Sequence, residues 1–274
     1  MTEAHDWIGR VGGTWASEWQ RTDRSFGDLA RRLDAAILAL APKAGRALDV
    51  GCGAGATSLA LAAARPDLSV VGADLSADQI AVARDRAAGR ANLCFVEGDV
   101  LRTAAAHGPF DLMVSRHGVM FFADPVAAFA ALHAAASPGA ALVFSSFREP
   151  AANAWVSEIV TAVTGAPSSP RADAPGPFAF AAATRVRQIL SDAGWSGIDL
   201  TPVDYSYLAG EGGDPVVDAV RFFRRIGPAA SLLRALPPAS LETALARIAE
   251  VCAARQSGGM VAFPAAAWLC SARA

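Results

Sequence analysis

The stretch from Ala47 to Gly55 carries the residues best suited to bind a small charged ligand. It reads as a short apolar strand followed by an acidic residue, Asp49, and by three glycines at alternate positions, Gly51, Gly53 and Gly55. Glycine lets the backbone approach a ligand closely because it has no Cβ. A helical pattern from Ala56 onward adds free N–H groups at a positive helix end. This pattern predicts a nucleotide site in an α/β sheet.

Two classes of ligand compete for this turn. Gly51, Gly53 and Ala56 match the G-x-G-x-x-G/A fingerprint of dinucleotide-binding folds. Asp49, however, precedes the first glycine by two positions and directs a carboxylate toward the ligand. A carboxylate at this point disfavours a pyrophosphate and favours a ligand that carries a sulfonium or an ammonium group.

Two further strand ends carry an acidic residue. Asp74 ends the apolar segment 69–74, about 20 residues beyond the glycine turn, where a carboxylate can accept hydrogen bonds from both ribose hydroxyls. Asp99 follows the third expected strand, Leu93–Glu97. Asp74 alone does not distinguish one adenosine cofactor from another.

Asp49-x-Gly51-x-Gly53-x-Gly55 resembles the first motif of class I S-adenosylmethionine methyltransferases. The run FDL…SRHGVMFFADP…SPGAALVFSSF resembles a bacterial group of small-molecule methyltransferases of the quinone-biosynthesis and sterol-methylating type, and this likeness extends over roughly residues 45–147. The resemblance implies S-adenosylmethionine as the cofactor and S-adenosylhomocysteine as the product. It also implies that the glycine turn packs against the methionine part of the cofactor.

The resemblance assigns the remaining cofactor contacts residue by residue. Asp74 binds the ribose, Leu75 flanks the adenine, and Gln79 lies on the following helix. Within Gly98-Asp99-Val100, the Asp accepts a hydrogen bond from the exocyclic amine of the adenine. After the fourth strand, the backbone carbonyl at Ser115 accepts from the methionine ammonium. Arg116 pairs either with the methionine carboxylate or with a buried acid such as Asp49.

His117 is the candidate general base. It follows the fourth expected strand, beside the expected methyl-donor site, and an unperturbed imidazole has a pKa suited to proton transfer at neutral pH. The alternative is that His117 only lines the cofactor site. Trp15 and Trp19 are candidates for closing over the cofactor, and Trp155 for lining the acceptor site.

Composition restricts the classes of partner. The chain has 274 residues, of which 53% are hydrophobic and 18% charged, and its net charge of −2 provides no broad attraction to nucleic acid. The four cysteines show no metal-ligand spacing, so no metal site is expected. Charged residues interrupt the apolar runs, and no signal-peptide core is present, so we expect a cytoplasmic protein without a membrane span.

Alternating strand and helix patterns over residues 46–147 predict a doubly wound, Rossmann-like α/β fold. Two more strands are expected, at residues 198–207 and 261–271, with Pro264 tolerated at a bulge or an edge. The resemblance implies seven strands in the order 3-2-1-4-5-7-6, with strand 7 antiparallel.

We expect one methyltransferase domain over residues 1–274. It comprises an N-terminal helical segment (1–45), a cofactor-binding core (46–149), two insertions that form a substrate lid (150–180 and 208–259), and the remaining core elements (181–207 and 260–274). The aromatic and aliphatic content of the insertions predicts an apolar site for a mostly hydrophobic small-molecule acceptor, although these side chains can also form core beneath the added helices. The oligomeric state is left open.

Four functions are considered at this point. A methyltransferase acting on a small molecule is the leading one. The alternatives are an NAD-dependent oxidoreductase with a Rossmann core and a non-catalytic S-adenosylmethionine-binding protein. A nucleic-acid or protein methyltransferase is disfavoured, because there is no basic excess and no Asn/Asp-Pro-Pro-Tyr motif after the fourth expected strand. The oxidoreductase lacks a recognisable hydride-transfer motif such as Tyr-x-x-x-Lys, because the sole lysine is Lys43.

Overall fold

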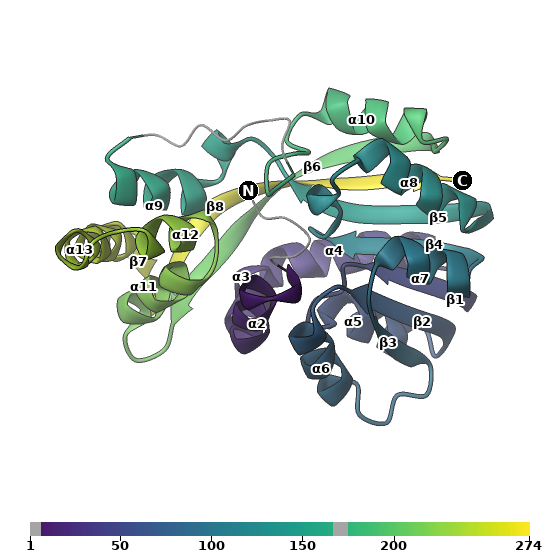
Figure 1. Ribbon diagram of the computed structural model, residues 1–274, viewed down its shortest axis with the longest axis horizontal. Coiled ribbons are helices and arrows are strands. Elements are labelled where there is room, and N and C mark those ends of the chain that lie inside the picture. Colours follow the sequence, from purple (N-terminus) through teal and green to yellow (C-terminus); the bar gives the residue numbers. More distant parts are fainter. Residues whose placement is uncertain (1–6, 167–174) are drawn as a thin grey trace.

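The computed structural model describes residues 7–166 and 175–274. Its strands form one sheet in the order β3-β2-β1-β4-β5-β8-β6, with the short strand β7 paired to β8 (Figure 1). Their bounds are β1 Ala44–Val50, β2 Asp67–Asp74, β3 Leu93–Glu97, β4 Phe110–Arg116, β5 Ala136–Phe147, β6 Ser196–Glu211, β7 Gln256–Ser257 and β8 Met260–Arg273.

Helices cover both faces of the parallel part of the sheet. One face carries α4 (Gly27–Leu40), α5 (Ala56–Ala64) and α6 (Ala77–Arg86), and the other carries α7 (Val100–His107), α8 (Pro125–Ala134) and α10 (Ala183–Asp192). The strands read as continuous apolar runs because both faces are buried. In β4, for example, Leu112, Met113 and Val114 are all fully buried.

The predicted sheet order is confirmed, with one addition. The strand expected as the seventh is β8, which lies antiparallel between β5 and β6. The addition is β7, a two-residue strand that pairs with the start of β8. Pro264 lies in β8 beyond the last residue that pairs with β5, Ala267, so its missing N–H interrupts no bond to β5.

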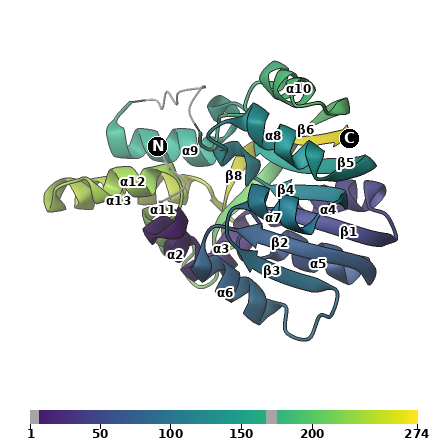
Figure 2. The ribbon, with the colours of Figure 1, turned by 45° about the vertical axis from the view of Figure 1, so that its right-hand side comes forward.

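Strands β6 and β8 are long enough to leave the core and support a second group of helices. This group, here named the cap, consists of α9 (Ala154–Thr164), α11 (Pro215–Arg225), α12 (Pro228–Arg234) and α13 (Pro238–Ala254). Its helices pack on one another and on β6 and β8. Figures 1 and 2 show the cap together at one end of the molecule, away from β1, β2 and β3.

Three helices precede the sheet: α2 (Arg10–Ser17), α3 (Trp19–Ser25) and α4. They lie within the segment 1–45 that was expected to be helical. Helix α2 lies very close to the start of α6, since a Cβ on Gly12 would come within 2.2 Å of the Ser76 hydroxyl. The small residue is what allows this approach.

The expected segments 1–45 and 150–180 are described only in part, because residues 1–6 and 167–174 lie outside the described residues. The expected segments at 150–180 and 208–259 contain the helices of the cap. In the described part of the chain, no helix is both long and apolar enough to cross a membrane.

Asn153 precedes α9 as its N-cap residue, but its side chain makes no capping bond. Instead, this fully buried amide donates to the carbonyls of Arg148, Glu149 and Ala266. Its oxygen accepts from the Trp155 indole and from the Ala266 amide. Asn153 therefore ties the start of the cap to β8.

We expect Asn153→Ala to lower the free energy of unfolding by about 2–4 kcal/mol, because it leaves several buried backbone groups and the Trp155 indole unpaired. Urea unfolding followed by tryptophan fluorescence measures the loss. Gln188→Ala, which removes a bond to Asp192 on the exposed side of α10, is the control and is expected to change the value by less than about 0.5 kcal/mol. An equal effect of both changes would contradict this role for Asn153.

Candidate functional site

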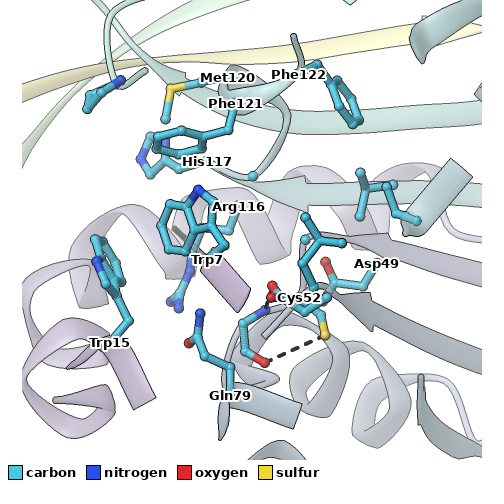
Figure 3. Close-up of a pocket in the computed structure, with 18 of the residues that line it drawn as sticks. Trp7, Trp15, Asp49, Cys52, Gln79, Arg116, His117, Met120, Phe121 and Phe122 are labelled. Carbon is cyan, nitrogen blue, oxygen red and sulfur yellow. Dashed lines mark hydrogen bonds between the residues drawn. The ribbon is translucent and has the colours of Figure 1, made fainter. Parts of the chain in front are cut away.

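A large cavity lies beyond the carboxyl ends of β1, β2, β4 and β5. Its volume is about 880 Å³, near the upper end of the range of about 300–1,000 Å³ typical of small-molecule sites. Helices α2 and α3 and the cap complete its walls. Figure 3 shows Asp49 and Cys52 on one side of it and Trp15 on the opposite side. This is the position at which open α/β sheets bind ligands.

The glycine turn forms one wall in the conformation that its spacing predicts. Gly51, Gly53 and Gly55 all have left-handed backbones, with φ of 67°, 55° and 82°. A Cβ on Gly55 would lie 2.6 Å from the Phe95 ring, and one on Gly53 would lie 3.2 Å from the Gln79 amide oxygen. Only glycine satisfies both constraints without strain.

The amides of this turn are already in use within the chain. Cys52 N donates to Ala73 O, Gly53 N donates to the Asp74 carboxylate, and Gly55 N donates to Cys52 O. A pyrophosphate site needs such amides to be free for the phosphate oxygens. The turn therefore presents glycine backbone to the cavity but does not offer these three amides to an anion.

Asp49 lies at the base of the cavity and is 1% exposed. One carboxylate oxygen accepts from the Ser58 hydroxyl at 2.6 Å, and the other is buried without a partner among the described residues. Burial in a low-dielectric environment raises the pKa of Asp49 to about 6. A cationic ligand group next to the open oxygen would supply the missing partner.

Asp74 ends β2 and fixes two backbone amides. Its carboxylate oxygens accept from Gly53 N and Ser76 N, each at 2.9 Å, and burial raises its pKa. Leu75 and Gln79 line the cavity beside it. The Ser76 hydroxyl caps α6 by accepting a hydrogen bond from the backbone N–H of Gln79.

Gly98, Asp99 and Val100 line the cavity next to Asp74. Asp99 is the N-cap of α7: one of its oxygens accepts from Leu101 N and Arg102 N. The second oxygen is not used in the cap and can accept a bond from a ligand.

Two of the residues expected at the cofactor do not line the cavity. Gly55 is the N-cap of α5 and lies beneath the turn against Phe95. Ser115 is fully buried, and its hydroxyl donates to Val50 O and accepts from Gly118 N. Both residues shape the backbone around the site.

Arg116 lines the cavity, but its ion-pair partner is Asp23 on α3 rather than Asp49, one of the two partners suggested from the sequence. The Nη2 atom of Arg116 lies 2.8 Å from Asp23. Arg86 binds the other oxygen of the same carboxylate at 2.7 Å. Sequence reasoning missed Asp23, because no local motif marks it.

His117 has a left-handed backbone, with φ of 61°, which is uncommon for a residue other than glycine. Its ring stacks on Phe147 at 4.1 Å, and neither ring nitrogen has a hydrogen-bond partner among the described residues. Burial, followed by the nearby positive charge of Arg116, lowers its pKa to about 3. The imidazole is therefore neutral at physiological pH.

A closed set of aromatic rings surrounds His117, and we name it the aromatic chamber. Phe26 contacts His117, Phe147 and Tyr207, while Trp155 stacks on Tyr207 at 4.7 Å and contacts Phe147. All five residues line the cavity. Phe147 could have been anticipated from its place at the carboxyl end of β5, whereas Phe26 and Tyr207 carry no local signal.

Charge divides the cavity into two parts. Five carboxylates line it, against a single arginine among the described residues: Asp23, Asp49, Asp74, Asp99 and Asp124 against Arg116. The glycine-turn side is therefore acidic, and the aromatic chamber is uncharged. An acidic site suits a cationic ligand and disfavours a pyrophosphate.

Comparison with known proteins identifies the class. Residues 47–139 match a family described as a methyltransferase domain. Over 133 residues the chain is 36% identical to a demethylmenaquinone methyltransferase of Thermus thermophilus, a match that spans 48% of this chain and 60% of that protein. It is 31% identical over 154 residues to a ubiquinone biosynthesis O-methyltransferase of Cronobacter sakazakii, a match that spans 54% of this chain and 62% of that one.

A solved structure extends the fold likeness to the whole chain. Phosphoethanolamine N-methyltransferase 2 of Haemonchus contortus, in complex with phosphomonomethylethanolamine and S-adenosylhomocysteine, matches all of this chain and 61% of that one, with a TM-score of 0.57 and 16% identity. The chain spans less than two thirds of the two curated relatives named above. Together with the domain match and the strand order, these findings confirm the Rossmann-like methyltransferase fold inferred from the sequence.

We expect Asp49→Asn to stabilise the ligand-free protein at pH 7 by about 2–3 kcal/mol. The unfolded chain loses this proton near its usual pKa of 3.8, whereas the folded protein keeps it up to about pH 6. Stability therefore falls as the pH rises from 3.8 to about 6, the full cost is present above pH 6, and the amide, which does not titrate, removes it. Urea unfolding at pH 7 and at pH 5 measures the difference, which should be smaller at pH 5.

The exposed substitution Asp85→Asn on α6 is the control, with an expected change below about 0.5 kcal/mol. Equal destabilisation by Asp49→Asn at both pH values would contradict the inferred cost of burying the Asp49 carboxylate.

Proposed function

We propose that this protein transfers a methyl group from S-adenosylmethionine to a mostly hydrophobic small molecule. The observation that carries the proposal is the open, buried oxygen of Asp49 at the base of an acidic cavity, beside a glycine turn whose amides are already in use. This arrangement suits a cofactor with an ammonium and a sulfonium group. The methyltransferase domain match supports the same cofactor.

The acidic part of the cavity provides a place for each part of the cofactor. In our proposal, Asp74 binds the ribose hydroxyls, and Leu75, Gln79 and the segment 98–100 hold the adenine. Gly51 and Gly53 pack against the methionine part, with Gly55 shaping the turn from below. The ammonium lies at Asp49 and the Ser115 carbonyl, and Arg116 pairs with the carboxylate.

The bound cofactor supplies an activated methyl group on a sulfonium leaving group. The protein therefore has mainly to align the acceptor and exclude water. The aromatic chamber is suited to both tasks, because its rings are rigid, uncharged and nearly closed to solvent. His117 lies within the chamber, and the next residue, Gly118, lies against Gly51 of the glycine turn.

His117 is our candidate for the group that receives the acceptor's proton. Its neutral ring keeps a lone pair available over the whole physiological pH range, since its pKa is lowered to about 3. The stacking on Phe147 fixes the direction of that lone pair. The same low pKa makes His117 a weak base, so in this proposal it acts on an acceptor hydroxyl whose proton becomes acidic as the methyl group is transferred.

The chamber favours an apolar acceptor over a phosphorylated one. A phosphate needs arginine or lysine partners, and Arg116, the single arginine that lines the described cavity, is taken by the carboxylate of the cofactor in this proposal. Two relatives, a demethylmenaquinone methyltransferase and a ubiquinone biosynthesis O-methyltransferase, point in the same direction by name. The expected lid segments, 150–180 and 208–259, would enclose this acceptor.

An NAD-dependent oxidoreductase is less well supported. Its sheet order is 3-2-1-4-5-6, without an antiparallel strand between the last two positions, whereas β8 occupies that place here. The proposal places the reaction in the cytoplasm, since the four cysteines are free thiols, which reducing compartments maintain. Nucleic acid and membrane partners are not part of it.

Transfer of labelled methyl from S-adenosylmethionine to a panel of apolar acceptors, both phenolic and non-phenolic, tests the proposed activity. We expect a labelled product with at least one apolar acceptor and none with phosphoethanolamine. Asp49→Asn should weaken S-adenosylhomocysteine binding by about tenfold or more, because the ligand ammonium loses a charged partner. Binding without turnover across the panel would favour the non-catalytic alternative.

The pair His117→Asn and His107→Asn tests the role of His117. Asn tolerates the left-handed backbone at residue 117, and His107 is an exposed residue at the end of α7. With a hydroxyl acceptor, we expect the first change to lower kcat by about 100-fold or more and the second to leave it unchanged. At saturating cofactor, titration of His117 should cause no change in the wild-type kcat between pH 5.5 and pH 8.

An unchanged kcat in His117→Asn would contradict the proton-transfer role. A fall in the wild-type kcat below pH 6.5 that disappears in His117→Asn would instead show an imidazole with an ordinary pKa.

A further inference from the structure

Side chains of helix α3 contact both the cofactor side of the cavity and the cap. Trp19, Thr22 and Asp23 line the cavity, and Phe26, which directly follows the helix, belongs to the aromatic chamber. Two arginines of the same helix bind α11 of the cap. A seven-residue helix thus carries two separate sets of charged contacts.

Asp23 makes the contacts on the cofactor side. One of its oxygens binds Arg116 at 2.8 Å and the other binds Arg86 at 2.7 Å. Arg86 also donates to Ala54 O in the glycine turn at 2.6 Å and stacks against the Trp19 ring at 4.0 Å. One carboxylate therefore holds guanidinium groups from the end of α6 and from the end of β4.

Arg116 depends on this region for its position. It uses Nη2 to bind Asp23, and its guanidinium lies 5.5 Å from the centre of the Phe26 ring. Its remaining N–H groups have no acceptor among the described residues. These groups are available to a ligand carboxylate, in a geometry that Asp23 and Phe26 fix in advance.

Asp218 on α11 makes the contacts on the cap side. It accepts from Arg21 at 2.7 Å and from Arg24 at 2.6 Å, and its side chain is 18% exposed. Arg24 also donates to the carbonyls of Leu208 and Ala209 on β6. A second link joins Arg225 of α11 to the buried Glu18 at the start of α3.

Neither Asp218 nor any other residue of α11 lines the cavity. The charged groups that join α11 to α3 nevertheless lie only a few residues from Asp23 along the same short helix. A displacement of the α3 residues that bind α11 therefore also displaces Asp23, because all of them lie on the same short helix.

We propose that Asp23 and Asp218 are positioning residues that act through α3. Asp23 holds Arg116 ready for the carboxylate end of the cofactor, and Asp218 holds α3 against the cap. Cofactor binding then stabilises α11, and loss of the α11 contact weakens cofactor binding. This inference rests on the proposed cofactor, and its test separates the two.

The first test compares two ligands by calorimetric titration. S-adenosylhomocysteine carries the carboxylate, and 5′-methylthioadenosine lacks the whole amino-acid end. We expect Asp23→Asn to weaken S-adenosylhomocysteine binding by about tenfold, because the Arg116 side chain must then be ordered on binding. Binding of 5′-methylthioadenosine should change by less than twofold. Asp23→Glu, which keeps the charge, should recover part of the loss.

The second test uses hydrogen exchange of α11. In the wild-type protein, S-adenosylhomocysteine should slow exchange over residues 219–225 at least threefold. In Asp218→Asn this slowing should be absent, and S-adenosylhomocysteine binding should weaken about threefold while 5′-methylthioadenosine binding stays the same. Glu242→Gln, on an exposed position of α13, is the matched control and should behave as the wild type.

Each outcome decides a separate question. No binding of S-adenosylhomocysteine to the wild-type protein would overturn the proposed function itself. Binding of both ligands that falls in parallel in Asp23→Asn would overturn the positioning role and leave the function intact. If Asp23→Asn does not fold, the ligand comparison is made on Asp218→Asn, where parallel losses or unchanged α11 protection overturn the inference.

Discussion

The site is organised around a buried charge that lacks a full set of partners within the protein. Asp49 is almost completely enclosed, and one of its carboxylate oxygens has no hydrogen-bond partner among the described residues. Burying such a group costs stability unless a partner is supplied. The Ser58 hydroxyl, which donates to the other oxygen, offsets only part of this cost, because burial still raises the pKa of Asp49 to about 6. A cationic ligand removes the cost, so ligand binding and stability are linked at this residue.

The remaining architecture divides the cavity between two tasks. Strands β1, β2 and β3 carry acidic residues at or just beyond their carboxyl ends, whereas β5, β6 and the cap contribute rings. The two long strands β6 and β8 make this possible, since they run from the core into the cap and pair with each other along almost their whole length. Helix α3 crosses between the two regions with charged contacts to each. The acidic and aromatic halves are therefore held in one rigid frame.

The parts of this structure that could be predicted from the sequence follow from local patterns. The glycine spacing, the acids at strand ends and the strand–helix alternation are each contained in a short stretch, so Asp49, Asp74 and Asp99 were identified as cavity residues. Asp23, Phe26 and Tyr207 were not, because their role arises from contacts between segments far apart in the chain. Arg116 was recognised, but its partner Asp23 lies 93 residues away. Asn153 is of a residue type common at helix N-caps, yet its amide binds β8 instead.

The most direct measurement of the central claim is a pair of calorimetric titrations, one with S-adenosylhomocysteine and one with NADH, on the wild-type protein and on Asp74→Ala. We expect micromolar binding of S-adenosylhomocysteine that is lost in Asp74→Ala, and no binding of NADH to either protein. Binding of NADH alone would contradict it, because a pyrophosphate would then occupy a turn whose amides are already in use and whose surroundings are acidic.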